Sequence, residues 1–236
     1  MSTAATKLEV LHEDNHLLVV NKPAELPTMG VAADRESLLT VAKQYIANKY
    51  NKPGNVYLGI VSRLDAPVTG LVVIAKTSKA ANRLTTAFRD RQVKKVYQAV
   101  VSGVPDPSSG HLQHYVRKDQ RHRRVHVTHE NCPDAQLARL HYQVLAQCNQ
   151  HSLVEVQLET GRKHQIRVQL AKLGQAIVGD RKYGSEASFP KGIALHSTTV
   201  EFTHPVRDQV LKLSAPLPDS WKNHRTTHQL VTLARM

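Results

Sequence analysis

The feature that most constrains the fold is a series of short apolar runs separated by turn-forming residues. The runs that predict strands cover residues 8–10, 17–20, 57–61, 71–75, 94–101, 138–145, 152–158, 194–202 and 211–213. Apolar residues recur at helical spacing in 37–50, 79–90 and 164–173. Strands outnumber helices and follow one another closely, so we predict an α+β fold with a mostly antiparallel mixed sheet flanked by helices.

Three local signals refine this expectation. Residues 71–75 are apolar throughout, which predicts a central strand covered on both faces. Ser78 is the expected N-cap of the second helix. In the third helix Ile166, Leu170 and Leu173 form the expected buried stripe. Arg167 falls at its edge, and Gly174 ends the helix.

The chain has no repeat and no clear linker, so we predict a single catalytic domain over residues 1–236 with its core at about 7–220. The basic run 117–124 is expected in an irregular hairpin. The residues after Trp221, 222–236, are expected to form a loose basic tail.

The charge balance favours a polyanionic partner. Lys and Arg total 32 against 19 Asp and Glu, which gives +13 with all 14 histidines neutral. RNA, DNA and anionic membrane surfaces all attract such a chain, although a basic enzyme of another kind is also compatible. Two cysteines, no secretory signal and no long apolar run lead us to expect a cytoplasmic protein without a membrane partner.

Several common sites are missing from the sequence. It has no Gly-rich dinucleotide fingerprint, no phosphate-binding loop and no G-x-S-x-G elbow. His122, His126 and His129 are close together, but they lie in a basic stretch that we expect to be poorly structured and without carboxylates or thiolates. We therefore expect neither a metal nor a cofactor.

Two polar segments are candidates for chemistry. The first, residues 62–70, contains Arg63 and Asp65, which would be a surface ion pair in an ordinary turn. The second, residues 160–167, opens a helix with four cationic or imidazole side chains. Taken alone, it is typical of a phosphate contact at a helix N-terminus.

Together these segments resemble the RluA-type family of RNA pseudouridine synthases. The matching stretches are DNHLLVVNKPA at 14–24, RLD at 63–65, KVY at 95–97, TGRKHQIR at 160–167, IVGD at 177–180, YG at 183–184 and LH at 195–196. An ordered set of this kind is far more specific than any single motif. The resemblance implies the pseudouridine synthase fold, with two half-domains and a central basic cleft.

The sequence departs from the family pattern at a few positions. Ser62 stands where the family usually has His, residues 67–70 read PVTG in place of Asp-Thr-Ser-Gly, and Glu25 stands where Gly usually follows Pro-Ala. These departures affect the expected substrate more than the chemistry. The chain has no room for the small N-terminal S4 domain of many relatives, so we expect a stand-alone catalytic domain.

The resemblance implies roles for three residues. Asp65 would attack the ribose or deprotonate it to give a glycal, and the sequence leaves both pathways open. Arg167 resembles the family's pairing arginine and would keep Asp65 ionised and oriented. Tyr97 would stack on the uracil or transfer a proton at C5, unless it is simply a core tyrosine.

Other residues are expected to hold the RNA. Arg63 resembles the arginine that fills the space left by the flipped nucleotide, and Leu195 resembles a pocket-wall residue or a plain core leucine. The predicted RNA-binding side chains, besides Arg63, are Arg162, Lys163, His164, Arg117, Lys118, Arg121, Arg123 and Arg124. The basic run is equally typical of a solvated face. The expected partner is an rRNA or tRNA stem-loop, and no protein partner is inferred.

Other functions fit less well. An inactive RNA-binding protein of the same fold would not need Asp65, Tyr97 and Arg167 together. A DNA-binding regulator would need a recognition helix, and a glycosidase would need a second placed carboxylate.

Overall fold

A computed structural model describes residues 7–32 and 34–236 and confirms the α+β architecture with antiparallel strand pairing. The chain groups into two compact units. The first contains residues up to Val93 together with Thr199–Pro216, and the second contains Lys94–Thr198 and Leu217–Met236. The single catalytic domain and the central cleft stay predictions.

The first unit is built on strands β2 and β4. Its elements are β1 (Glu9–Glu13), β2 (Leu17–Lys22), α1 (Leu38–Lys49), β3 (Gly59–Ile60), β4 (Thr69–Ala75), α2 (Ser78–Arg89) and β11 (Val210–Ser214). Strand β2 pairs with β1 and β4, β3 pairs with β4, and β11 pairs with the end of β10 (Leu195–Thr203).

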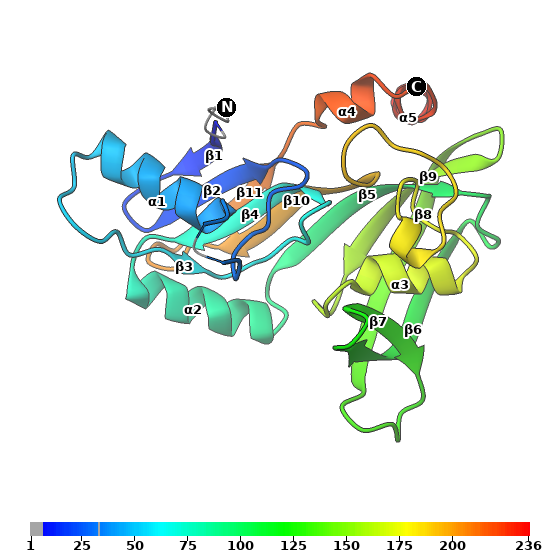
Figure 1. The fold of residues 1–236 in the computed structure, drawn as a ribbon, viewed down its shortest axis with the longest axis horizontal. Helices are drawn as coiled ribbons and strands as arrows, with labels where there is room; N and C mark the ends of the chain where they lie inside the picture. The colour runs from blue at the N-terminus through cyan, green and yellow to red at the C-terminus, as the bar shows by residue number, and fades with distance from the viewer. Residues whose placement is uncertain (1–6, 33) are drawn as a thin grey trace. The chain divides into compact units, whose positions relative to one another are not determined.

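The prediction of a central strand covered on both faces is confirmed. Every residue of β4 and of its neighbour β2 is buried. Alternate residues of these strands face opposite ways, so Leu18 and Val20 pack against α1 whereas Leu17 and Val19 pack against α2. Figure 1 shows α1 and α2 on the two sides of this sheet.

The start of α2 differs from the prediction by one residue. Thr77, and not Ser78, is the N-cap, because Thr77 has extended backbone angles and its hydroxyl accepts a hydrogen bond from the Ala80 amide at 3.2 Å. Ser78 is already the first helical residue. Both residue types suit an N-cap, so the sequence alone could not distinguish them.

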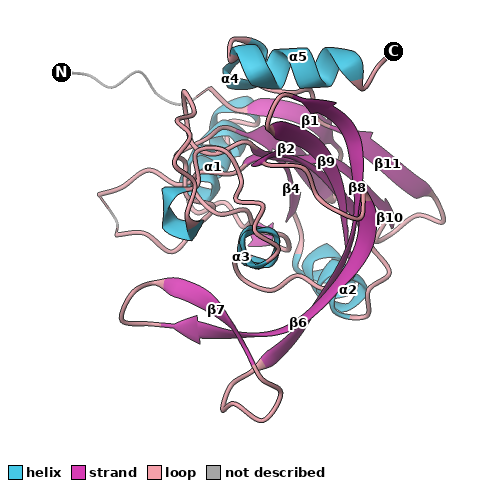
Figure 2. Cartoon of the chain, turned by 90° about the vertical axis from the view of Figure 1, so that its right-hand side faces the viewer, coloured by secondary structure: helices cyan, strands magenta, loops and turns pink. Residues whose placement is uncertain are grey.

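The second unit is a curved sheet in the order β5-β9-β8-β6-β7. Its elements are β5 (Lys94–Ser102), β6 (Ser109–Asp119), β7 (Arg124–Thr128), β8 (Gln136–Cys148), β9 (His151–Leu158), α3 (Gln165–Lys172), the 3₁₀ helix η1 (Arg181–Tyr183), α4 (Asp219–Lys222) and α5 (Arg225–Leu233). Figure 2 shows α3 on the inner side of the curve that β8 and β6 describe.

The prediction of an irregular hairpin for the basic run is wrong. Strands β6 and β7 pair in a regular antiparallel register from Tyr115 opposite Thr128 to Asp119 opposite Arg124. Val116 and Val125 are buried with α3 in one apolar cluster. The hairpin is therefore ordered by an apolar face that its dense charge obscures in the sequence.

The prediction of a loose tail after Trp221 is also wrong. Helix α5 packs against β8 and β9, and its residues Thr227 and Leu230 are fully buried. Trp221 itself is 1% exposed, so the core extends past residue 220. The apolar stripe of α5 is short, and its burial depends on the sheet it meets.

None of the described helices is both long and apolar enough to span a bilayer.

Candidate active site

Asp65 lies in the turn between β3 and β4, and two buried polar side chains fix the residues beside it. The Thr28 hydroxyl donates to the Leu64 carbonyl at 2.8 Å and accepts from the Leu64 amide at 3.2 Å. The Lys22 ammonium donates to the Ala66 carbonyl at 3.1 Å. The half-buried Asp65 is thus held on both sides by the end of β2 and the segment that follows it.

Lys22 is a residue to which the sequence analysis gave no role. Its side chain is fully buried, and its ammonium donates to the carbonyls of Pro23 at 2.8 Å, Leu26 at 2.8 Å and Ala66 at 3.1 Å. Burial lowers the pKa of Lys22 to about 7, against the opposing effect of the Asp65 charge. The protonated form therefore places a positive charge close to the Asp65 carboxylate.

Replacing Lys22 with Met is expected to remove a pH dependence of stability. The pKa of Lys22 is about 7 in the folded chain, against an ordinary value of 10.5. Between these values the unfolded chain binds more protons, so the free energy of unfolding of the native chain rises with pH, by up to about 5 kcal/mol. Below about pH 7 Lys22 is charged in both states, so this gain is absent there.

Urea unfolding of the native chain and of Lys22→Met, at about pH 6, 8 and 10, measures this contribution. The native-minus-variant difference in free energy should increase with pH. Parallel stability curves would contradict the depressed pKa.

The backbone at Glu25 adopts a conformation that glycine would adopt more readily. Glu25 has a φ of 66°, in the left-handed region that glycine adopts without strain. Glycine is the residue that the family usually has at this position. The turn between Lys22 and Thr28 therefore holds a backbone conformation that suits glycine, although Glu25 occupies it.

Arg167, predicted at the edge of the helical stripe, is buried inside the second unit. It is 5% exposed, and Asp180 is 2% exposed. Its Nε donates to Asp180 Oδ2 at 2.7 Å and its Nη2 to Asp180 Oδ1 at 2.9 Å. A contact with two hydrogen bonds fixes the plane of the guanidinium. Asp180 therefore orients Arg167, a role that the sequence motif at 177–180 did not reveal.

Tyr183 connects Arg167 to the basic hairpin. The Arg167 guanidinium carbon lies 5.0 Å from the centre of the Tyr183 ring. The Tyr183 oxygen accepts from the Val125 amide at 3.0 Å and lies 2.7 Å from His164 Nδ1. The guanidinium of Arg124 donates to the Lys182 carbonyl. Arg124 and His164 are therefore both engaged within the protein.

The turn before α3 is held by Gln165. The Gln165 side-chain oxygen lies 2.7 Å from the Thr160 hydroxyl and accepts from the Arg162 amide at 2.9 Å. His164 adopts a left-handed conformation with φ 53° at the start of α3. Arg162 and Lys163 are exposed on this turn, as a phosphate contact at a helix N-terminus requires.

The remaining predicted residues are distributed over both units. Arg63 is exposed beside Asp65 in the first unit. In the second unit, Tyr97 is half-buried on β5 opposite Val156, and Leu195 is 3% exposed at the start of β10. The approach of Asp65 to Tyr97 and Arg167 stays a prediction.

Four of the five predicted RNA-binding side chains on the hairpin are exposed: Arg117, Lys118, Arg121 and Arg123. One expectation here was wrong, because a carboxylate does accompany the nearby histidines. Asp119 Oδ2 lies 2.7 Å from His122 Nδ1 and 3.6 Å from His126 Nε2. The His122 backbone amide and side chain lower the pKa of Asp119 to about 2.

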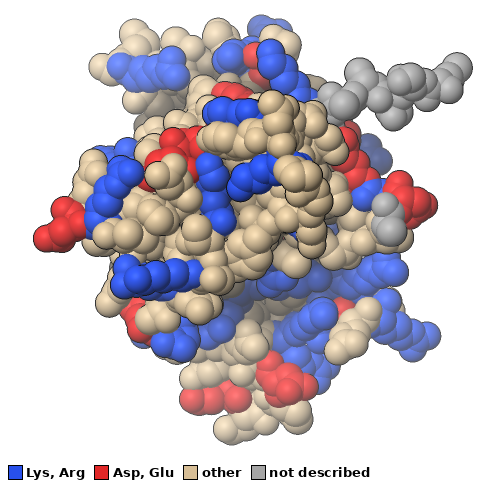
Figure 3. All heavy atoms as spheres, turned by 90° about the vertical axis from the view of Figure 1, so that its left-hand side faces the viewer, with Lys and Arg blue, Asp and Glu red and all other residues tan. Residues whose placement is uncertain are grey.

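Lys and Arg also dominate the charged surface elsewhere. On the face drawn in Figure 3 their atoms cover more area than those of Asp and Glu. This distribution agrees with the net charge of +13 and with a polyanionic substrate.

Comparison with known proteins identifies the family. Residues 16–172 match the family model described as RNA pseudouridylate synthase. The uncharacterized RNA pseudouridine synthase YhcT of Bacillus subtilis is 34% identical over 223 residues, which cover 92% of this chain and 71% of that protein. Ribosomal large subunit pseudouridine synthase D of Pseudomonas aeruginosa is 34% identical over 234 residues, covering 91% and 70%.

A solved structure supports the same assignment. The human RNA pseudouridylate synthase domain containing 4 matches with a TM-score of 0.75 and 27% identity, covering 96% of this chain and 93% of that one. The family model covers more than half of the chain and includes the resembling stretches at 63–65, 95–97 and 160–167. The chain therefore belongs to the RluA family of RNA pseudouridine synthases, isomerases that act on uridine in RNA.

Proposed function

We propose that this enzyme converts specific uridines in structured RNA, rRNA or tRNA, to pseudouridine, with Asp65 as the catalytic carboxylate. The observation that carries the proposal is the way Lys22 and Thr28 fix the backbone on both sides of Asp65. A reacting group has to be held in place for efficient catalysis. The relatives named for the large ribosomal subunit favour rRNA over tRNA.

The reaction requires little from the protein beyond one carboxylate and a pocket for the base. The C1′–N1 bond of the uridine breaks, the uracil turns, and C5 bonds to C1′ before the C5 proton leaves. Asp65 either adds to C1′ or removes a sugar proton to give a glycal. No redox step occurs, because the product is an isomer of the substrate.

Arg167 completes the proposed site. Its guanidinium, oriented by Asp180, would pair with the Asp65 carboxylate and keep it ionised. Arg63 is exposed beside Asp65, so it can enter the stack that the target nucleotide leaves. Extruding a base costs a few kcal/mol, which contacts of this kind help to offset.

Replacing Tyr97 with Phe separates its two proposed roles. The half-buried ring can reach a bound base, and Phe keeps its stacking surface. If the hydroxyl transfers the C5 proton, we expect kcat to fall by about 100-fold or more while the KM for RNA changes little. Unchanged kcat in a tritium-release assay with C5-labelled RNA would assign Tyr97 to stacking alone.

The exposed arginines of the β6–β7 hairpin are expected to contact phosphates. Changing Arg121 and Arg123 together to Gln should reduce the slope of log K against log salt concentration by about 1.5, since each phosphate contact contributes about 0.7–0.9. Fluorescence anisotropy with a labelled stem-loop measures this slope. An unchanged slope would mean that these side chains are exposed to solvent and do not contact RNA phosphates.

The function is tested by mapping pseudouridines in total RNA from a strain without this gene and from its parent. We expect at least one uridine to lose its modification, and the native gene but not its Asp65→Asn form should restore it. If every site persisted, the alternative of an inactive RNA-binding protein would be favoured.

A further inference from the structure

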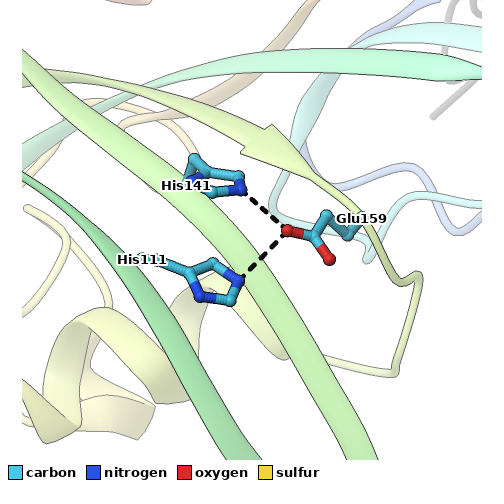
Figure 4. A group of neighbouring side chains, drawn as sticks. All are labelled: His111, His141 and Glu159. Atoms are coloured by element: carbon cyan, nitrogen blue, oxygen red, sulfur yellow. Dashed lines mark ion pairs between the residues drawn. The ribbon is translucent and has the colours of Figure 1, made fainter.

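Three side chains of the second unit that have no role in the proposed site lie close together: His111, His141 and Glu159. His111 on β6 and His141 on β8 are direct cross-strand partners, so both side chains leave the same face of the sheet. Their rings stack with centroids 4.4 Å apart and an interplanar angle of 25°. Glu159 follows β9, and its amide donates to the Arg139 carbonyl of β8 at 3.2 Å. Figure 4 shows both rings directed at the Glu159 carboxylate.

The geometry of this group suits a tetrahedral cation. Both Nε2 atoms approach one oxygen, Glu159 Oε1, at 3.1 Å from His111 and 2.7 Å from His141. The three potential ligand atoms all lie within 4.8 Å of one another. Tetrahedral zinc with bonds of 2.0–2.1 Å separates its ligand atoms by about 3.3 Å. Small side-chain rotations would therefore bring all three atoms to bonding distance.

The ligand chemistry selects the kind of metal. Two imidazoles and one carboxylate suit zinc and its first-row neighbours, whereas magnesium and calcium prefer oxygen ligands alone. The second carboxylate oxygen, Oε2, lies 3.1 Å from Arg139 Nε. In this arrangement Oε2 faces Arg139, and Oε1 faces the two imidazoles.

We propose that His111, His141 and Glu159 bind a zinc ion, with the fourth position open to water. This proposal departs from the sequence expectation of no metal and does not depend on the proposed function. Glu159 directly precedes the Thr160-Gly161 turn that begins the α3 segment. The metal ties this turn to β6 and β8, so it stabilises the segment that presents Arg162 and Lys163.

Zinc binding is measured by calorimetric titration of the full chain, purified without a histidine tag and stripped of metal, with zinc chloride. We expect one equivalent to bind, and His111→Ala, His141→Ala and Glu159→Gln each to weaken binding by about 10-fold or more. Zinc should also raise the Tm of the native chain but not that of the variants. The Tm without zinc reports whether each variant folds.

The matched control is the double variant His122→Ala/His126→Ala. It removes two exposed imidazoles beside the Asp119 carboxylate, the other group of similar composition in the hairpin. This variant should bind zinc as the native chain does. Absence of binding to the native chain, equal affinity in folded ligand variants, or loss of binding in the control alone would each overturn the proposal.

Discussion

Asp65→Asn is expected to abolish pseudouridine formation while RNA binding stays intact. The amide keeps the size of the carboxylate, and the bonds from Lys22 and Thr28 go to the neighbouring backbone, so the turn should keep its shape. The amide is a poor nucleophile and carries no negative charge for the sugar centre. We expect the rate to fall by at least about 10³-fold, as on loss of other catalytic groups.

Tritium release from C5-labelled RNA measures the turnover, and fluorescence anisotropy measures the binding. Asp208→Asn is a suitable control, because Asp208 is an exposed aspartate of the same unit in the loop between β10 and β11. It should leave both quantities unchanged. Normal turnover by Asp65→Asn would remove Asp65 from the chemistry, whereas loss of binding would show that the turn itself had been disturbed.

Asp180→Asn is expected to lower the free energy of unfolding by about 3–5 kcal/mol, the range found when one partner of a buried ion pair is removed. Arg167 and Asp180 are almost fully buried, and both bonds between them are short. The neutral amide leaves the guanidinium charge poorly compensated in a medium of low polarity. Because Arg167 is proposed to orient Asp65, we also expect kcat to fall while RNA affinity changes little.

Urea unfolding measures the stability, and Asp219→Asn provides the matched control. Asp219 forms an ion pair with Lys222 at 3.0 Å, but its side chain is 84% exposed. An exposed pair of this kind contributes little, so the control should unfold like the native chain. Equal stability of the two variants would mean that the Asp180 contact is not the anchor of Arg167. A fall in kcat that disappears at a temperature where the Asp180→Asn variant is fully folded would argue for a purely structural role.

Local patterns in the sequence predicted most of the regular elements. The uninterrupted apolar run of β4 predicted a strand covered on both faces. Side chains of a strand alternate between the two faces of the sheet, so apolar residues at every position indicate that both faces are buried. The helical spacing of 37–50 predicted α1, which begins at Leu38 after its N-cap Ser37. In both cases the residues of the element itself carry the pattern that predicts its structure.

Two elements were mispredicted for a common reason. The β6–β7 hairpin was expected to be irregular because Arg and Lys dominate it, and its order comes from two valines that pack on α3. Residues 222–236 were expected to be loose because they are basic and end the chain, and the order of α5 comes from the sheet beneath it. Composition describes the exposed face, whereas packing on a distant partner determines whether the segment is ordered.

The sequence by itself determined the family, the chemistry it implies and the residues that match its motifs, since these depend on residue identity in a fixed order. Only the tertiary structure decided that Lys22 anchors the Asp65 turn from 44 positions away, that Asp180 holds Arg167, and that His111 and His141 meet Glu159. Each of these contacts joins segments that are separate in the sequence, because hydrogen bonds and ion pairs form between atoms that are close in space, whatever their separation along the chain.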